Sequence, residues 1–383
     1  MSKTIASVCD SKASLSATGV SRHIGLLDPV RVCLTVLVIF HHTAITYGGS
    51  GSWYFRDADS PEWLRVLLSM FTATNQAFFM GFFFLLAGYF TPGSLARKGA
   101  ARFSLDRLLR LGLPVLAFAA LLSPMTRTIV LWDGTGDLGQ ALSSVLVSWR
   151  FDAGPLWFCI ALLIFSAVWL GLARLRVRVT LPDLAPHWWI GLMVLGVAVL
   201  SFGLRLWMPV GKSLFGLQLG YFSSYIVLFA AGALMAKAHW LTRIDWRLAG
   251  PWVCLALVVF PGLWIYAMLG GAFDGDFWRG GVNLPALAYA FWEPFVAAGA
   301  ILGCLAFFRR FTPAPASIWR RLADGSFPAF VIHPPVVVGA SLLVRSLVDA
   351  AWLKFLLAGL IACVLSFALA ACLPGKRAPG LLP

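Results

Sequence analysis

Apolar runs of membrane-spanning length recur along the whole chain and constrain its fold more than any other feature. A helix needs about 20 mainly apolar residues to cross the hydrocarbon core of a bilayer. Runs of this kind follow one another, separated by short polar breaks, from residue 28 onward. Since 60% of the residues are hydrophobic and only 12% are charged, soluble domains are excluded. The sequence therefore predicts an all-α, polytopic membrane bundle of about ten transmembrane helices.

The first predicted helix contains the stretch from Asp28 to His42. Further spans are expected near 66–90, 108–130, 155–173, 187–207, 214–236, 250–270, 285–308, 325–346 and 352–373. Only a short polar turn separates the spans at 187–207 and 214–236, so a merged or re-entrant arrangement remains an alternative there. Residues 23–375 are expected to form the transmembrane domain. Residues 1–22, which lack the apolar core of a signal peptide, and 376–383 are predicted to be cytoplasmic tails, the first of them disordered.

The formal charge of +14 reflects the topology of the protein in the membrane rather than binding to nucleic acid. Most of the 30 lysines and arginines fall in alternate loops, in short clusters between apolar runs. Cytoplasmic loops of membrane proteins carry this excess, so the distribution predicts a multi-pass protein of the plasma or inner membrane with both termini in the cytoplasm. One such cluster, Arg97, Lys98 and Arg102, is expected to contact lipid headgroups.

Several chemistries have no support in the sequence. The cysteines are scattered singly, without the spacing of a metal site or a disulfide framework, and we expect no metal. The sequence also lacks a Walker lysine motif, a GxSxG elbow and an HExxH motif. The sequence therefore gives no support to an ATPase, an ordinary serine hydrolase or a zinc protease.

The first predicted helix carries ionisable residues where hydrocarbon-compatible ones are expected. At 3.6 residues per turn, Arg31 and His42 lie on one face, about 16 Å apart along the axis, and Asp28 falls on the same stripe. Asp28 and Arg31 are also explained as a polar cap at the helix start. His42 lies three turns deeper, which favours a lined tunnel because buried ionisable groups usually face a cavity. His41, rotated by about 100°, remains a competitor for the role of His42.

Further polar residues each have a functional and a structural interpretation. Arg107 and Arg110 share a helix face and form a fork suited to phosphate groups, or they contact lipid headgroups. Trp157 follows a Gly-Pro turn and is either an interfacial residue or part of a binding site. Glu293 lies inside an apolar run, where it either orients a catalytic imidazole or pairs with a structural arginine. His333 precedes two prolines and either caps the carbonyls they leave free or faces a cavity.

These motifs, taken in order, resemble the acyltransferase 3 family of multi-pass membrane O-acyltransferases, which includes glucan succinyltransferase-like and O-antigen acetyltransferase-like proteins. The likeness spans roughly 23–373. It rests on Arg-x10-His at Arg31 and His42, Arg-x-x-Arg at Arg107 and Arg110, GPLWF at 154–158, and SFPAFVIHPP around His333.

The resemblance implies transfer of an acyl group, such as acetyl or succinyl, from a cytoplasmic acyl-CoA to a hydroxyl of an envelope or exported carbohydrate. It implies that Arg107 and Arg110 hold the phosphates of the donor and that Arg31, fixed by Asp28, steers it. The same resemblance makes His42 the general base.

Glu293 or His333 would then hold the tautomer of His42, and Trp157 would contact the acceptor. A proton-coupled secondary transporter that uses His42 and Glu293 is the alternative. It is disfavoured because the chain shows no internal repeat.

Overall fold

The computed structural model describes residues 26–57, 59–174, 186–236, 239–270, 277–311 and 317–373, and these residues are almost entirely helical. The expected tails, 1–22 and 376–383, lie outside the described residues. The α-helices are α2 (Leu27–Thr46), α3 (Glu62–Lys98), α4 (Ala100–Arg107), α5 (Leu113–Ala117), α6 (Ser123–Thr135), α7 (Leu138–Val147), α8 (Trp157–Arg174), α9 (His187–Arg205), α10 (Phe222–Met235), α11 (Trp240–Arg243), α12 (Trp246–Gly270), α13 (Leu284–Phe311), α14 (Ser317–Arg345) and α15 (Ala351–Cys372).

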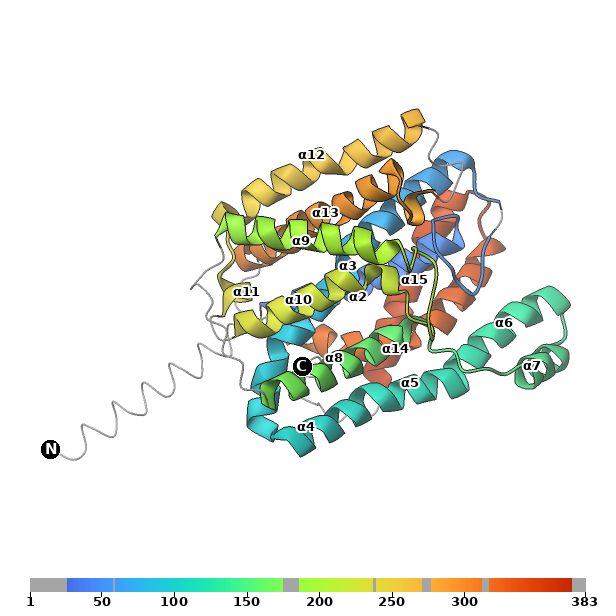
Figure 1. Ribbon diagram of the computed structural model, residues 1–383. Helices are drawn as coiled ribbons and strands as arrows, with labels where there is room; N and C mark the ends of the chain where they lie inside the picture. Colours follow the sequence, from blue (N-terminus) through green and yellow to red (C-terminus); the bar gives the residue numbers. More distant parts are fainter. Residues whose placement is uncertain are drawn as a thin grey trace.

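Nine helices in the described part of the chain are long and apolar enough to cross a membrane. They confirm the predicted all-α bundle, in which the third pass is a continuous rod of α4, α5 and α6. The remaining expected span, at 214–236, is a shorter apolar helix, Leu219–Met235. In Figure 1, α10 runs beside α9 and returns the chain to the end of the bundle where α12 begins. Residues 206–218 separate α9 from α10, so the two spans are not merged.

Burial separates central helices from peripheral ones. In α2 and α3, 72% of the apolar window is buried inside the protein, against 22% in α12 and 28% in the α4–α6 rod. Figure 1 shows α2 and α3 in the middle of the bundle, with α12 on one side and the rod on the other. Polar side chains on α2 and α3 therefore face other helices, whereas the leucines exposed on the rod are placed to face lipid.

Prolines shape the third pass. Two π-helical turns, Leu108–Gly112 and Phe118–Leu122, interrupt it, and Pro114 and Pro124 each follow one of these turns by two residues. A proline has no N–H and its ring clashes with the preceding turn, so a wider turn relieves the clash. The angular spacing of side chains consequently differs from that of a regular α-helix at the point where this pass begins.

Two glycines allow α3 and α10 to approach each other closely. A Cβ atom on Gly88 would lie 2.0 Å from the carbonyl oxygen of Phe229, and one on Gly232 would lie 2.1 Å from that of Leu85. Helices in membranes gain much of their contact energy from close backbone approach at such small residues. This contact fixes α10 against the centre of the bundle.

A buried ion pair holds the connection between α2 and α3. Asp57 lies 3.3 Å from the ammonium of Lys354 in α15, and both side chains are buried. The backbone N–H of Asp57 also donates to the carbonyl of Thr46 at 2.8 Å. The connection is thereby folded back onto the end of the bundle.

Candidate functional site

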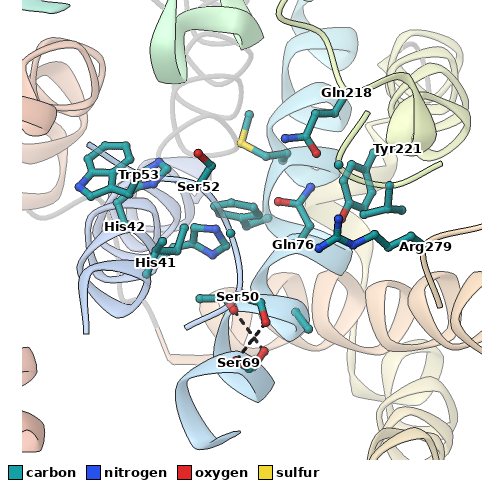
Figure 2. Close-up of a pocket in the computed structure, with 18 of the residues that line it drawn as sticks. His41, His42, Ser50, Ser52, Trp53, Ser69, Gln76, Gln218, Tyr221 and Arg279 are labelled. Carbon is teal, nitrogen blue, oxygen red and sulfur yellow. Dashed lines mark hydrogen bonds between the residues drawn. The ribbon is translucent and has the colours of Figure 1, made fainter. Parts of the chain in front are cut away.

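A cavity of about 1480 Å³, here called the central cavity, opens at one end of the bundle. Its walls include the connections that follow α2, α7, α9 and α12, together with faces of α2 and α3. Successive passes alternate in direction, so these connections all lie at the same end. In Figure 2, His41, His42 and Trp53 lie on one side of the space, opposite Gln76 and other polar side chains.

Both histidines of α2 face the central cavity. The cavity contacts α2 at Val38, His41, His42 and Ile45, a spacing that forms one helical stripe. His41 is buried and His42 is partly exposed. His42 is therefore the more accessible of the two to a bound substrate.

The ring of His42 is held by two aromatic neighbours. Trp53, from the connection after α2, stacks on it with a centroid distance of 3.8 Å and an interplanar angle of 16°. The ring of His333 lies 5.2 Å away, inclined by 19°. The ring of His41 instead packs against Phe79 at 4.9 Å. Of the expected site residues, the structure thus brings His42 and His333 together.

His333 is fully buried and its ring is anchored to its own helix. Nδ1 of His333 makes a 2.6 Å hydrogen bond with the carbonyl oxygen of Phe330. Pro334 lies four residues after Phe330 and has no N–H to offer that carbonyl. The structural interpretation, in which the histidine caps a carbonyl freed by proline, is therefore confirmed. His333 is not itself part of the cavity lining.

Glu293 pairs with an arginine rather than with a histidine. Its carboxylate forms a buried ion pair with Arg205 of α9. Of the two interpretations of Glu293, the structure shows the pairing with a structural arginine. The guanidinium of Arg205 also lies over the rings of Tyr221 and Tyr289, both of which line the cavity. Glu293 lies behind the wall of the cavity through its pairing with Arg205, and no hydrogen bond or ion pair among the described residues joins it to His42.

Asp152 organises another part of the wall. It accepts hydrogen bonds from the hydroxyls of Tyr54 at 3.0 Å and Ser123 at 2.8 Å, and from the backbone N–H of Gly154 at 2.8 Å. Burial, together with the neighbouring carboxylate, raises the pKa of Tyr54, so its phenol stays protonated and donates. Trp157, expected at a binding site, lines the cavity beyond this network.

Asp28 and Arg31 lie in the first turns of α2, away from the central cavity. A guanidinium nitrogen of Arg31 is 3.5 Å from the carboxylate of Asp28, which confirms the pairing expected from their spacing. A second nitrogen donates to the carbonyl of Ala323 in α14 at 3.4 Å. The cavity lining on α2 begins only at Val38, so it does not cover the whole polar stripe expected from the sequence. The role of Arg31 toward a donor stays a prediction.

Arg107 and Arg110 have different surroundings, and their joint binding of phosphate stays a prediction. Arg107 is buried, where it contacts the hydroxyl of Thr91 at 3.4 Å. Arg110 is about a quarter exposed and lies 2.8 Å from Asp106. The π-helical turn Leu108–Gly112 begins directly after Arg107 and contains Arg110, so the angular spacing of the two side chains differs from that on a regular α-helix. They remain near one another, at the end of the bundle opposite the central cavity.

Sequence reasoning missed several residues of the site. Trp53 and Tyr54 lie in a loop whose path the sequence does not indicate. Arg205 had a detectable signal, because it is an arginine inside a predicted span. Among the described residues, no group of three His, Cys, Asp or Glu side chains is arranged to hold a metal ion.

A comparison with known protein families assigns the chain to one of them. No curated protein and no solved structure gives a match to this sequence. A family model described as an acyltransferase domain matches residues 24–373, which is most of the chain. The chain therefore belongs to the acyltransferase 3 family and is a multi-pass membrane enzyme that transfers an acyl group.

Proposed function

We propose that this enzyme is an O-acyltransferase that moves an acyl group from a cytoplasmic acyl-CoA to a hydroxyl of an envelope or exported carbohydrate. The observation that carries the proposal is the position of His42 on the wall of a cavity of about 1480 Å³. An imidazole titrates near neutral pH and is the side chain that most often acts as a general base.

The walls of the central cavity suit a sugar acceptor. They combine the aromatic rings of Trp157 and Tyr221 with the side-chain amides of Gln76 and Gln218, which Figure 2 shows in part. An amide both donates and accepts hydrogen bonds, as a sugar hydroxyl does. Binding pockets of this kind use apolar walls for affinity and a few polar groups for orientation.

The opposite end of the bundle suits the acyl donor. Arg31, at the start of α2, and Arg107 and Arg110, at the start of the third pass, all lie at this end. Guanidinium groups form strong, charge-assisted hydrogen bonds with phosphate. The excess of basic residues on this side supports a cytoplasmic location, with both termini in the cytoplasm. A donor entering here extends about 16 Å along α2 to bring its thioester to His42.

The reaction needs one proton to be moved. His42 takes the proton of the acceptor hydroxyl while the hydroxyl oxygen attacks the thioester carbonyl, forming a tetrahedral intermediate. The carbon–sulfur bond then breaks, and the imidazolium returns the proton to the departing thiolate of CoA. The products are the ester and free CoA, and the enzyme is unchanged.

A reconstituted assay tests this proposal. The protein in proteoliposomes is given radiolabelled acetyl-CoA or succinyl-CoA and a panel of envelope glycans, and the label in the glycan is measured. We expect His42→Ala to lower the transfer rate by a factor of about 100 to 10,000, the usual contribution of a general base. His187→Ala, a histidine substitution at the start of α9, is the matched control and should transfer normally. A well-folded His42→Ala variant that transfers at the normal rate contradicts the proposal.

A further inference from the structure

Two ring nitrogens in the centre of the bundle have no hydrogen-bond partner. Nδ1 of His42 and Nε2 of His333 are both buried, and neither is paired with any residue that the structure describes. A buried polar atom without a partner costs free energy, because water satisfied it in the unfolded chain. Two such atoms on neighbouring rings therefore require a common explanation.

The protonation of His333 follows from its anchor. Its Nδ1 lies 2.6 Å from the carbonyl oxygen of Phe330, and a carbonyl oxygen can only accept a hydrogen bond. Nδ1 of His333 therefore carries the hydrogen. In the neutral ring, Nε2 is then an acceptor with a free lone pair.

The ring geometry places the His333 imidazole beside His42. Trp53 covers one face of His42, since their nearly parallel rings are only 3.8 Å apart. The ring of His333 is nearly parallel to both, at 5.2 Å from His42 and 5.8 Å from Trp53. From these distances, the directions from His42 to Trp53 and to His333 form nearly a right angle. His333 therefore lies beside the edge of the His42 ring rather than over its face, and the two unpaired nitrogens belong to these adjacent rings.

We propose that His333 is a positioning residue whose Nε2 accepts a hydrogen bond from Nδ1–H of His42 during the reaction. The proposal rests on the proposed function, in which His42 is the general base. A hydrogen on Nδ1 leaves Nε2 of His42 with its lone pair available to the central cavity. The carbonyl of Phe330 has no helical donor, because Pro334 lacks an N–H. It therefore holds the hydrogen on Nδ1 of His333 and sets the direction of both hydrogen bonds.

This arrangement has a consequence for the transfer step. When Nε2 of His42 takes the proton of the acceptor hydroxyl, the ring becomes an imidazolium with hydrogens on both nitrogens. Nε2 of His333 stabilises that cation by accepting from Nδ1, and the proton on Nε2 later passes to the thiolate. The paired ring also keeps its orientation through both steps.

The same argument does not extend to His41. Its Nδ1 is also buried without a partner among the described residues, but its ring packs against Phe79, which has no acceptor atom. Its other ring neighbour is His42 itself, which it meets edge to face at 89°. The pairing with His333 thus distinguishes two adjacent histidines that face one cavity.

Two substitutions at His333 separate the positioning role from the structural one. In His333→Asn, the amide nitrogen takes the place of Nδ1 and keeps the bond to Phe330, but the side chain ends short of Nε2. In His333→Gln, a carbonyl oxygen reaches the place of Nε2. We expect His333→Asn to lower kcat at least tenfold with the KM for acyl-CoA unchanged, and His333→Gln to recover part of that loss. His187→Asn is the matched control.

Nitrogen NMR of histidine-labelled protein gives a readout that needs no substrate. We expect the His42 signals, assigned by their loss in His42→Ala, to report the Nδ1–H tautomer in the wild type and to change in His333→Asn. If His333→Asn does not fold, the wild-type spectrum still decides, because an Nε2–H tautomer of His42 overturns the inference. A folded His333→Asn variant with unchanged kcat and an unchanged His42 tautomer also overturns the inference. In that case the proposed function still stands, provided that His42→Ala is inactive.

Discussion

Arg205 and Glu293 form a buried ion pair between α9 and α13, directly behind the wall of the central cavity. Nε of Arg205 also donates to the carbonyl of Gly220 at 3.0 Å. The guanidinium lies 5.3 Å from the ring centre of Tyr221 and 5.0 Å from that of Tyr289. A single arginine therefore ties these two tyrosines of the wall to the core of the bundle.

Removing one member of this pair is expected to destabilise the protein strongly. Arg205→Met or Glu293→Gln leaves the partner uncompensated in a low-dielectric interior, a change that costs about 3–5 kcal/mol. The double variant Arg205→Met with Glu293→Leu should recover much of that loss, because no charge remains buried. Thermal unfolding of the detergent-purified proteins gives their melting temperatures, which rank the variants by stability.

The double variant also tests the role of Glu293. If Glu293 acts only through the cavity wall, the double variant should retain transfer activity with a raised KM for the acceptor. A stable double variant whose kcat falls as far as that of His42→Ala would instead assign Glu293 to the chemistry. Single variants that unfold at the wild-type temperature would contradict the stability argument.

Arg110 is expected to contribute to donor binding more than to chemistry. Arg110→Ala removes a partly exposed guanidinium at the end of the bundle assigned to acyl-CoA. The loss of a hydrogen bond to a charged group is about 1.5–3 kcal/mol, which corresponds to a rise in KM of roughly tenfold to a hundredfold. Because binding is lost equally in the ground and transition states, kcat should stay the same.

Arg102 provides the control for Arg110. It is an exposed basic residue near the same end of the bundle, which we expect to contact headgroups. Arg102→Ala should leave the KM for acyl-CoA unchanged. Equal KM values for Arg110→Ala and the wild type, measured in initial-rate kinetics, would remove Arg110 from the donor site.

Tyr54 is expected to support acceptor binding through Asp152. Tyr54→Phe removes one of the two hydroxyl donors to a single carboxylate oxygen of Asp152, and Ser123→Ala removes the other. The loss of a donor loosens the loop that carries Tyr54 and the turn that follows Asp152. Both segments form parts of the cavity wall. Each variant should raise the KM for the acceptor roughly tenfold, the effect of one hydrogen bond to a charged group. The KM for acyl-CoA should be unaffected, and a change confined to that KM would contradict the assignment.

Local patterns in the sequence predict a substantial part of this structure. The apolar runs locate the passes because length and hydropathy are properties of each segment alone. The pairing of Asp28 with Arg31 is equally local, since residues three apart are neighbours on a helix. The depth of His42 in the bundle follows from the same helical geometry.

Other features depend on contacts between distant segments. Arg205 and Glu293 are 88 residues apart, and the sequence gives no reason to pair them rather than others. Trp53 reaches His42 because its loop is tied back by Asp57 and Lys354, which are 297 residues apart. The expected fork of Arg107 and Arg110 assumed a regular α-helix, whereas a π-helical turn begins directly after Arg107 and contains Arg110.

The contact between α3 and α10 gives the last prediction. In Gly88→Ala, the new methyl group would lie 2.0 Å from the backbone oxygen of Phe229, and a backbone atom cannot rotate away as a side chain can. The helices must separate, which costs about 1–3 kcal/mol or more by overpacking. Gly196→Ala is the matched control, because a methyl group on Gly196 of α9 meets nothing within 4 Å.

The two glycine variants should move stability in opposite directions. Alanine is favoured over glycine inside a helix by roughly 0.5–1 kcal/mol, so Gly196→Ala should melt at or slightly above the wild-type temperature. Gly88→Ala should melt below it and lose transfer activity, because α10 follows directly after the cavity residue Tyr221 and is displaced with it. Thermal unfolding in detergent compares the variants. Equal melting temperatures for Gly88→Ala and the wild type would show that α3 and α10 are not in backbone contact.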